Sequence, residues 1–245
     1  YFCFAAGALA AGLAFGVNPV REVASAGVAI ACLVGLAVSI VRRKAGVSGQ
    51  TAEFDRRSER VAAMTGIDRQ VAVDESAEDA TPDLGPEFNP ILDLVPALIG
   101  TVGLVAAALD AGGNTFVALL RTLIGAAFIG AISDGMLLGH WYLVQPGLPR
   151  KLLNEMVSAL GWLWPLEVGA LLLPDGMISV WNGSVDDGCG GLLGLMWAMC
   201  AVTTIVLVFV TRAALKEKYY SAVMAATGLL YLAILTAFGT DIVAR

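Results

Sequence analysis

Two ionisable residues lie deep inside neighbouring apolar runs of this chain. Arg121 lies six residues from one end of the run 115 to 143, and Glu167 lies six residues from one end of the run 152 to 173. If the runs are antiparallel helices that span a membrane, both side chains lie about 9 Å inside the membrane, measured from the same surface. An arginine and a carboxylate there can form two parallel hydrogen bonds, which offset part of their desolvation cost. We interpret them first as a structural ion pair, second as a substrate or proton site, and third as an arginine that extends toward the interface.

Asp134 is a third ionisable residue at membrane depth, and no cap or basic neighbour in the sequence explains it. With Asp93, His140 and Glu155 it forms a set in the opposite half of the membrane, where carboxylates and a histidine can relay protons or hold a metal ion. Structural roles are the alternative, because Asp93 and Glu155 lie in first helical turns, where the helix dipole favours an acid. Asp134 and His140 are about 240° apart on a helix, so they cannot form a joint site on that helix alone.

The remaining sequence offers little for catalysis or metal binding. His140 is the only histidine, so one copy cannot hold a bis-histidine haem. Motifs for nucleotide hydrolysis, esterase chemistry and zinc proteolysis are absent, and the four cysteines have no C-x-x-C spacing. We therefore predict neither a catalytic site nor a metal site nor a resident cofactor. Contact with a lipid, quinone or pigment stays open, because three tryptophans are of the type that lines such grooves, although packing is their commoner role: Trp162, Trp164 and Trp197.

The composition indicates an integral membrane protein. Of 245 residues, 58% are hydrophobic and 15% are charged, against about 25% charged in a soluble domain. A net charge of -6 argues against a nucleic-acid-binding protein, whose surface is usually basic.

Seven apolar runs are long enough, or nearly so, to cross a bilayer, which takes about 20 helical residues. They lie near residues 2 to 17, 23 to 41, 91 to 109, 115 to 143, 152 to 173, 190 to 211 and 219 to 239. Residues 201 to 210 are apolar on every side, unlike the alternating strands of a membrane barrel. We predict an all-α, polytopic membrane bundle of about seven transmembrane helices. Because the first run is short and the chain starts at Tyr1, we expect further residues before it.

The basic residues predict the orientation. Twelve of the 15 lie in connections that alternate to share one side: Arg42, Arg43, Lys44, Arg56, Arg57, Arg60, Arg69, Arg150, Lys151, Arg212, Lys216 and Lys218. Since such residues stay on the cytoplasmic side, we expect a cytoplasmic N-terminus and an outer C-terminus in a bacterial inner membrane.

Three regions follow from this reading: helices over 1–44, an acidic cytoplasmic loop over 45–90, and five helices over 91–245. The loop carries ten acidic and four basic residues, so its charge equals that of the whole chain. Residues 51 to 67 have the spacing of a short amphipathic helix, and residues 74 to 87 resemble an extended acidic linker. The loop is either a docking surface for a soluble partner or, more commonly for such segments, a solvated connection.

Small residues at helical spacing predict close helix packing. The candidate pairs are Gly12 with Gly16, Gly27 with Ala31 and Gly35, and Gly190 with Gly194. The run 115 to 143 carries small residues on two faces, which predicts a central helix: Gly125, Phe128, Ile132, Gly135 and Gly139 on the Arg121 face, and Ala127, Gly130 and Ala131 on the Asp134 face.

Two shorter features concern the membrane surface. Trp141 and Tyr142, with His140, are expected to anchor that run at the inner interface. Between the apolar runs 152 to 173 and 190 to 211, the segment 177 to 181 predicts a short interfacial helix followed by a turn.

Two functions fit this sequence. The first is a non-catalytic subunit of a larger, bacterial energy-transducing membrane complex, which contributes packing and assembly and contacts other membrane subunits and lipids. The second is a small proton-coupled transporter or carrier that uses Asp134, Arg121 and Glu167.

Overall fold

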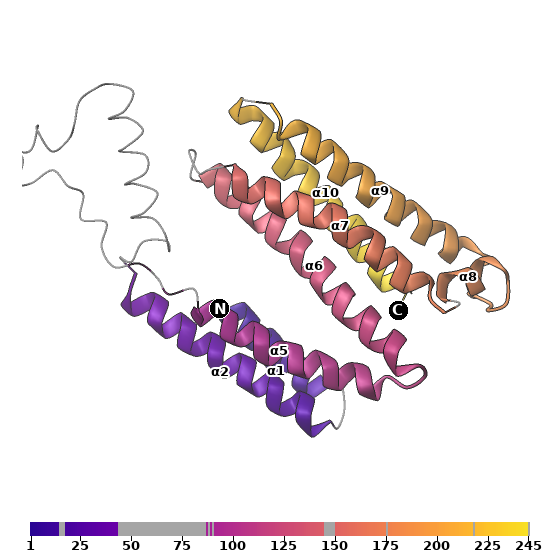
Figure 1. The fold of residues 1–245 in the computed structure, drawn as a ribbon, viewed down its shortest axis with the longest axis horizontal. Coiled ribbons are helices and arrows are strands. Elements are labelled where there is room, and N and C mark those ends of the chain that lie inside the picture. Colours follow the sequence, from indigo (N-terminus) through magenta and orange to yellow (C-terminus); the bar gives the residue numbers. More distant parts are fainter. Residues whose placement is uncertain are drawn as a thin grey trace, which may run out of the picture. The chain divides into compact units, whose positions relative to one another are not determined.

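The computed structural model describes residues 1–14, 18–43, 87, 89, 91–144, 150–174, 176–217 and 219–244. Of this part, 86% is helical and none of it forms a strand, which confirms the predicted all-α fold. The helices, labelled in Figure 1, are α1 (Phe2–Ala14), α2 (Pro19–Val41), α5 (Ile91–Asp110), α6 (Thr115–Val144), α7 (Lys151–Leu172), α8 (Gly176–Trp181), α9 (Leu192–Ala214) and α10 (Tyr220–Ala244).

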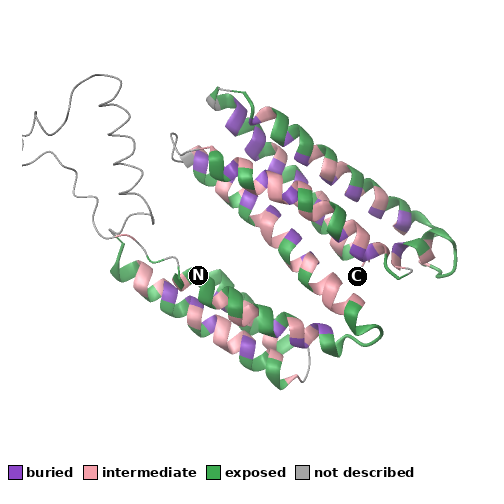
Figure 2. Cartoon of the chain, in the orientation of Figure 1, coloured by how far each residue is buried: buried purple, intermediate pink, exposed green. Residues whose placement is uncertain are grey.

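Five of the described helices are long and apolar enough to cross a membrane, so the chain is a multi-pass membrane protein: α2, α5, α6, α9 and α10. The other two predicted spans also form helices. However, α1 has only 13 residues, and α7 carries Asn154, Glu155 and Glu167, which lower its hydropathy. Exposed residues lie along the described helices (Figure 2), and many of them are large and apolar, as expected of a surface that lipid tails cover.

Asparagine side chains begin three of the helices. Asn18 accepts a hydrogen bond from the backbone N–H of Arg21 at 3.0 Å, and Pro19 occupies the next position. These two residues start α2 four residues before the apolar run that predicted it. Asn89 accepts from the N–H of Ile91 at 3.0 Å, at the start of α5, the helix that contains Asp93. Asn114 accepts from the first turn of α6.

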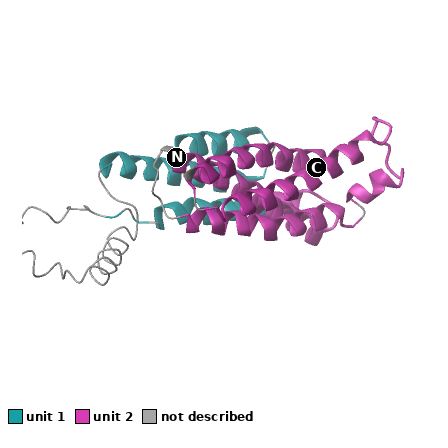
Figure 3. Ribbon diagram, turned by 90° about the horizontal axis from the view of Figure 1, so that it is seen from above, with its two compact units in different colours: residues 1–106 teal, residues 107–245 magenta. Residues whose placement is uncertain are grey.

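The described helices divide into two compact units, residues 1–106 and 107–245, coloured teal and magenta in Figure 3. In the first unit, small residues allow α1, α2 and α5 to approach closely. A Cβ added at Gly12 would lie 2.9 Å from Ser25, and one added at Gly27 would lie 3.1 Å from Ile99. The packing predicted for Gly27 is therefore present. Sequence order alone grouped α5 with the later helices, whereas the structure groups most of it with α1 and α2.

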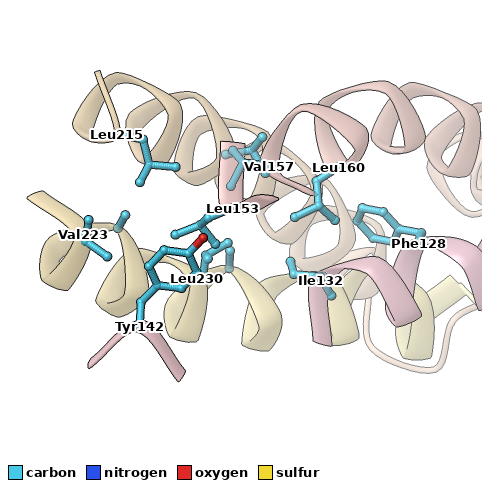
Figure 4. Packing of buried hydrophobic residues seen from close by; sticks show 13 residues of the cluster. Phe128, Ile132, Tyr142, Leu153, Val157, Leu160, Leu215, Val223 and Leu230 are labelled. Atoms are coloured by element: carbon cyan, nitrogen blue, oxygen red, sulfur yellow. The ribbon is translucent and has the colours of Figure 1, made fainter. Parts of the chain in front are cut away.

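The second unit contains α6, α7, α9 and α10 around one apolar core, with the short α8 at one end. The side chains in Figure 4 point into this core from all four long helices. Phe128 and Ile132 are fully buried, and a Cβ at Gly139 would lie 2.9 Å from Thr227 of α10. These residues lie on the Arg121 face of α6, whose predicted packing is confirmed. The predicted central helix is not shown, because Ala127 on the Asp134 face is exposed and a Cβ at Gly130 would meet no atom within 4 Å.

One predicted helix-packing pair is wrong. Gly190 precedes α9 and has a φ of 64°, so it lies in a turn rather than on a helix with Gly194. The consecutive positive φ values at Gly190 and Gly191 end any helical register there. Gly194 itself packs against Trp181 of α8. Three predicted features lie outside the described residues: the helix over 51 to 67, the linker over 74 to 87 except for Glu87, and the partner of Gly12 at Gly16.

Candidate functional site

Arg121 binds the carboxyl-terminal end of α7. Its Nε donates to the carbonyl of Ala170 at 3.0 Å, and its Nη2 donates to the carbonyls of Leu171, at 3.5 Å, and Leu173. The last carbonyls of a helix have no partner within it, and a cation beside them is favoured by the helix dipole. Arg121 therefore has a structural role that differs from the three interpretations of the sequence: it binds main-chain carbonyls at a helix end.

Glu167 lies at the same end of α7. It is fully buried and precedes Ala170 by three residues, which is about one helical turn. The guanidinium thus contacts α7 about one turn beyond Glu167, and the ion pair between the two side chains stays a prediction. Whether Glu167 serves as a structural residue or as a proton or substrate site stays a prediction.

Helix α8 closes this end of the second unit. A Cβ at Gly176 would overlap the carbonyl oxygen of Leu171 and lie 2.8 Å from Nη2 of Arg121, so only glycine fits there. Met177 is buried with Leu171 and Trp197, and the rings of Trp181 and Trp197 meet edge to face at 5.5 Å. The predicted short helix over 177 to 181 is confirmed by α8, and Trp197 serves helix packing there.

The turn after α8 is organised by Asp187, a residue that the sequence reasoning did not single out. Its carboxylate accepts hydrogen bonds from the backbone N–H groups of Gly191 and Cys189, both at 3.0 Å, and of Leu193, at 3.1 Å. Together they hold the pKa of Asp187 below its usual range, Gly191 contributing most. An aspartate followed by four residues that include three glycines is a recognisable turn signal, and it could have identified this position.

Four residues were predicted to form a set in the half of the membrane opposite Arg121, and the structure gives each of them different neighbours: Asp93, Asp134, His140 and Glu155. Nδ1 of His140 lies 3.3 Å from the hydroxyl of Tyr231, whose ring it meets edge to face. Glu155 lies 3.7 Å from Nζ of Lys151, and both side chains are exposed. In the first unit, Asp93 accepts a hydrogen bond from the hydroxyl of Tyr1.

These placements bear on the predicted metal or proton chemistry. Within the described ranges, no group of three or more His, Cys, Asp and Glu side chains could hold a metal ion. His140 interacts with Tyr231, which the sequence reasoning missed because the two residues are 91 positions apart. Only the fold brings these two residues together.

The two predicted interface anchors differ. Trp141 is 53% exposed, as an anchor should be, but Tyr142 is only 2% exposed and belongs to the core shown in Figure 4. Successive helical residues point about 100° apart, so one of them faces outward and the other packs inward. The prediction that Tyr142 is an interface anchor needs this correction.

Asp134 is exposed on α6, seven residues before Trp141 on the same face. If Trp141 marks the interface, Asp134 lies about 10 Å inside it. An aspartate has no long stem with which to reach the interface, and an ionised one near the bilayer centre costs about 2.5 to 3.5 kcal/mol on insertion scales. Contact with lipid alone is therefore unfavourable for this face of α6.

No family model, curated protein or solved structure matches this chain. Its function is accordingly inferred from its own residues. Arg121 and Asp134, the two most conspicuous of these, are about 140° apart around α6. One turns toward the end of α7, and the other turns away from the core of the second unit.

Proposed function

We propose that this chain is a non-catalytic subunit of a larger membrane assembly, in which it provides a helix surface for other subunits. One observation carries the proposal: an exposed acidic residue, Asp134, lies within a helix that crosses the membrane. Surrounding that face with protein rather than lipid removes an unfavourable contact. The opposite face of α6 already packs in this way against α7 and α10.

The carrier alternative is less well supported by the geometry. It requires Asp134, Arg121 and Glu167 to line one cavity. Arg121 is engaged with the carbonyls that end α7, and Asp134 lies on a different face of its helix. We therefore rank the subunit function first.

The proposal includes a topology of about seven spans, in which α1 and α7 also cross the membrane. The N-terminus is cytoplasmic and the C-terminus is outside, since this arrangement keeps the basic connections on one side. The partners are other membrane subunits and lipids, with a soluble protein as a candidate partner of the acidic segment 45–90. The narrower form of the proposal is a bacterial energy-transducing complex in the cytoplasmic membrane.

Purification in a mild detergent tests the subunit function. We expect the full chain to elute with other membrane proteins in fixed ratio. A monodisperse particle that contains only this chain would contradict the proposal. Liposomes that contain the purified chain test the carrier alternative, which predicts a proton or solute flux that Asp134→Asn abolishes.

The genes beside the coding sequence test the narrower form. A respiratory or photosynthetic operon would support an energy-transducing complex. An operon for uptake of a solute would instead favour the carrier.

A further inference from the structure

The outward face of α6 carries one acidic residue among small and apolar ones. Along this face, residues recur at alternating intervals of four and three, and all of them are exposed or half-exposed: Phe116, Leu120, Leu123, Ala127, Gly130, Asp134, Leu137 and Trp141. Every face of an α-helix has this spacing. What distinguishes this face is an acidic residue next to two small ones, Ala127 and Gly130, within a membrane-spanning helix.

The opposite face of α6 shows what this spacing does in the same helix. There the intervals of four and three run through Arg121, Gly125, Phe128, Ile132, Gly135, Gly139 and Tyr142, and the residues pack against α7 and α10. Small residues at Gly135 and Gly139 allow the close approach. The outward face carries its small residues in the same way, at Ala127 and Gly130, and a Cβ at Gly130 would meet no atom within 4 Å. Within the second unit, the space beside Gly130 is therefore open to another helix.

Asp134 specifies the charge of that helix. It lies one turn after Gly130 on this face, about 10 Å from the level of Trp141. Its complement at this depth is a lysine or arginine. The interiors of the described helices offer only Arg121, which is at the other end of α6; the remaining basic residues of α2, α7 and α9 lie in their first or last turns.

We infer that the outward face of α6 binds a transmembrane helix of another protein, and that this helix carries a lysine or arginine that pairs with Asp134. The inference rests on the subunit function proposed above and names the chemistry of its partner. Burial of the pair within a protein contact removes both charges from lipid.

Photo-crosslinking in the membranes of the cells that make the protein tests this pairing. The full chain carries p-benzoylphenylalanine in place of Leu137, which lies one turn from Asp134 on the same face and is 52% exposed. We expect one discrete adduct with another membrane protein, and the linked peptide should contain a lysine or arginine within an apolar span. Leu235 of α10, which is 69% exposed, provides the matched control and should give no such adduct.

Charge variants make the test specific. Asp134→Asn should lower the yield of the Leu137 adduct about tenfold, which is about 1.4 kcal/mol, while Asp134→Glu should largely retain it. Reversing both charges, with Asp134→Lys and an acidic residue in the partner, should restore the yield. Unchanged elution and thermal unfolding of the Asn variant show that it is folded.

Several results would overturn the inference. They are an adduct with a second copy of this chain, an adduct within the same chain, labelling of lipid alone, a linked peptide without a basic residue, and a yield that Asp134→Asn does not change. Failure of the subunit function is recognised separately. If other chains co-purify in fixed ratio but the adduct yield does not depend on the charge at position 134, only the pairing is wrong. If the chain purifies alone, both proposals fail.

Discussion

At the scale of single residues, Asp187 shows how one side chain can define a turn outside the membrane-spanning helices. Three backbone N–H groups bind its carboxylate, and one of them, from Leu193, belongs to the first turn of α9. Because Gly191 has no side chain to cap the helix, this carboxylate takes that role from four residues earlier. The turn therefore depends on the ionised form of Asp187.

We expect Asp187→Asn to lower the thermal unfolding midpoint at neutral pH. The folded state depresses the pKa of Asp187, so the carboxylate stabilises the fold above the unfolded value of about 3.9. That contribution is lost as the pH falls through the folded pKa. The difference between wild type and variant, measured in detergent from pH 7 downward, should therefore shrink in acid. Asp186→Asn, which affects a single bond to Gly188, is the control, and a difference that persists unchanged in acid would contradict this role.

At the scale of elements, α8 is positioned by close contact rather than by its own length, since a helix of six residues is not stable alone. The absence of a side chain at Gly176 lets α8 approach the end of α7 and the guanidinium of Arg121. Trp181 then packs on Gly194 of α9. The position of α8 thus depends on two glycines and on the arginine that occupies the end of α7.

Gly176→Ala should accordingly destabilise the second unit by about 1 to 3 kcal/mol, because the new Cβ overlaps backbone that cannot move freely. Gly169→Ala is a matched control in α7, where a Cβ meets nothing within 4 Å; there alanine should be neutral or stabilise by up to about 1 kcal/mol. The apparent midpoint of thermal unfolding in detergent measures both. Equal effects of the two substitutions would show that the contact at Gly176 is unimportant.

The sequence predicted some elements better than others, for physical reasons that α6 illustrates. Its buried face could be predicted because Phe128, Ile132 and the glycines repeat at helical spacing. The role of Arg121 could not, since it binds main-chain carbonyls, which every residue has and no pattern marks. Tyr142 was misassigned because composition locates aromatic residues near an interface without saying which way each one points.

At the scale of the whole molecule, the membrane topology depends on whether α7 crosses the bilayer. Its hydropathy is the weakest among the long helices, yet it follows α9 in the antiparallel direction along its length. Arg150 donates to the carbonyl of Glu217 beyond the end of α9, Trp164 donates to the carbonyl of Ala201 at 2.9 Å, and Leu171 packs with Trp197. Since α9 crosses the membrane, we expect α7, which packs along it, to cross as well.

Cysteine labelling tests this topology, because the chain already has free, exposed cysteines at the informative places, Cys3 and Cys189. An impermeant maleimide on intact cells should label Cys189 when the other cysteines are replaced. It should reach Cys3 only after permeabilisation, because seven spans put the N-terminus in the cytoplasm. Ala111→Cys, placed between α5 and α6, should be labelled from outside, and Lys216→Cys only from inside.

Each alternative topology gives a different pattern. If α7 does not cross, the cysteine at 111 stays accessible, Cys189 becomes protected and the one at 216 becomes accessible. If the whole topology is inverted, the cysteine at 111 is also protected from the impermeant maleimide. If α1 does not cross, only Cys3 changes sides. This outcome matters because α1 has 13 residues. Its length of about 20 Å is less than the roughly 30 Å thickness of the hydrocarbon core. Labelling of Cys3 from outside would thus remove α1 from the count while leaving the packing of α6 and α7 intact.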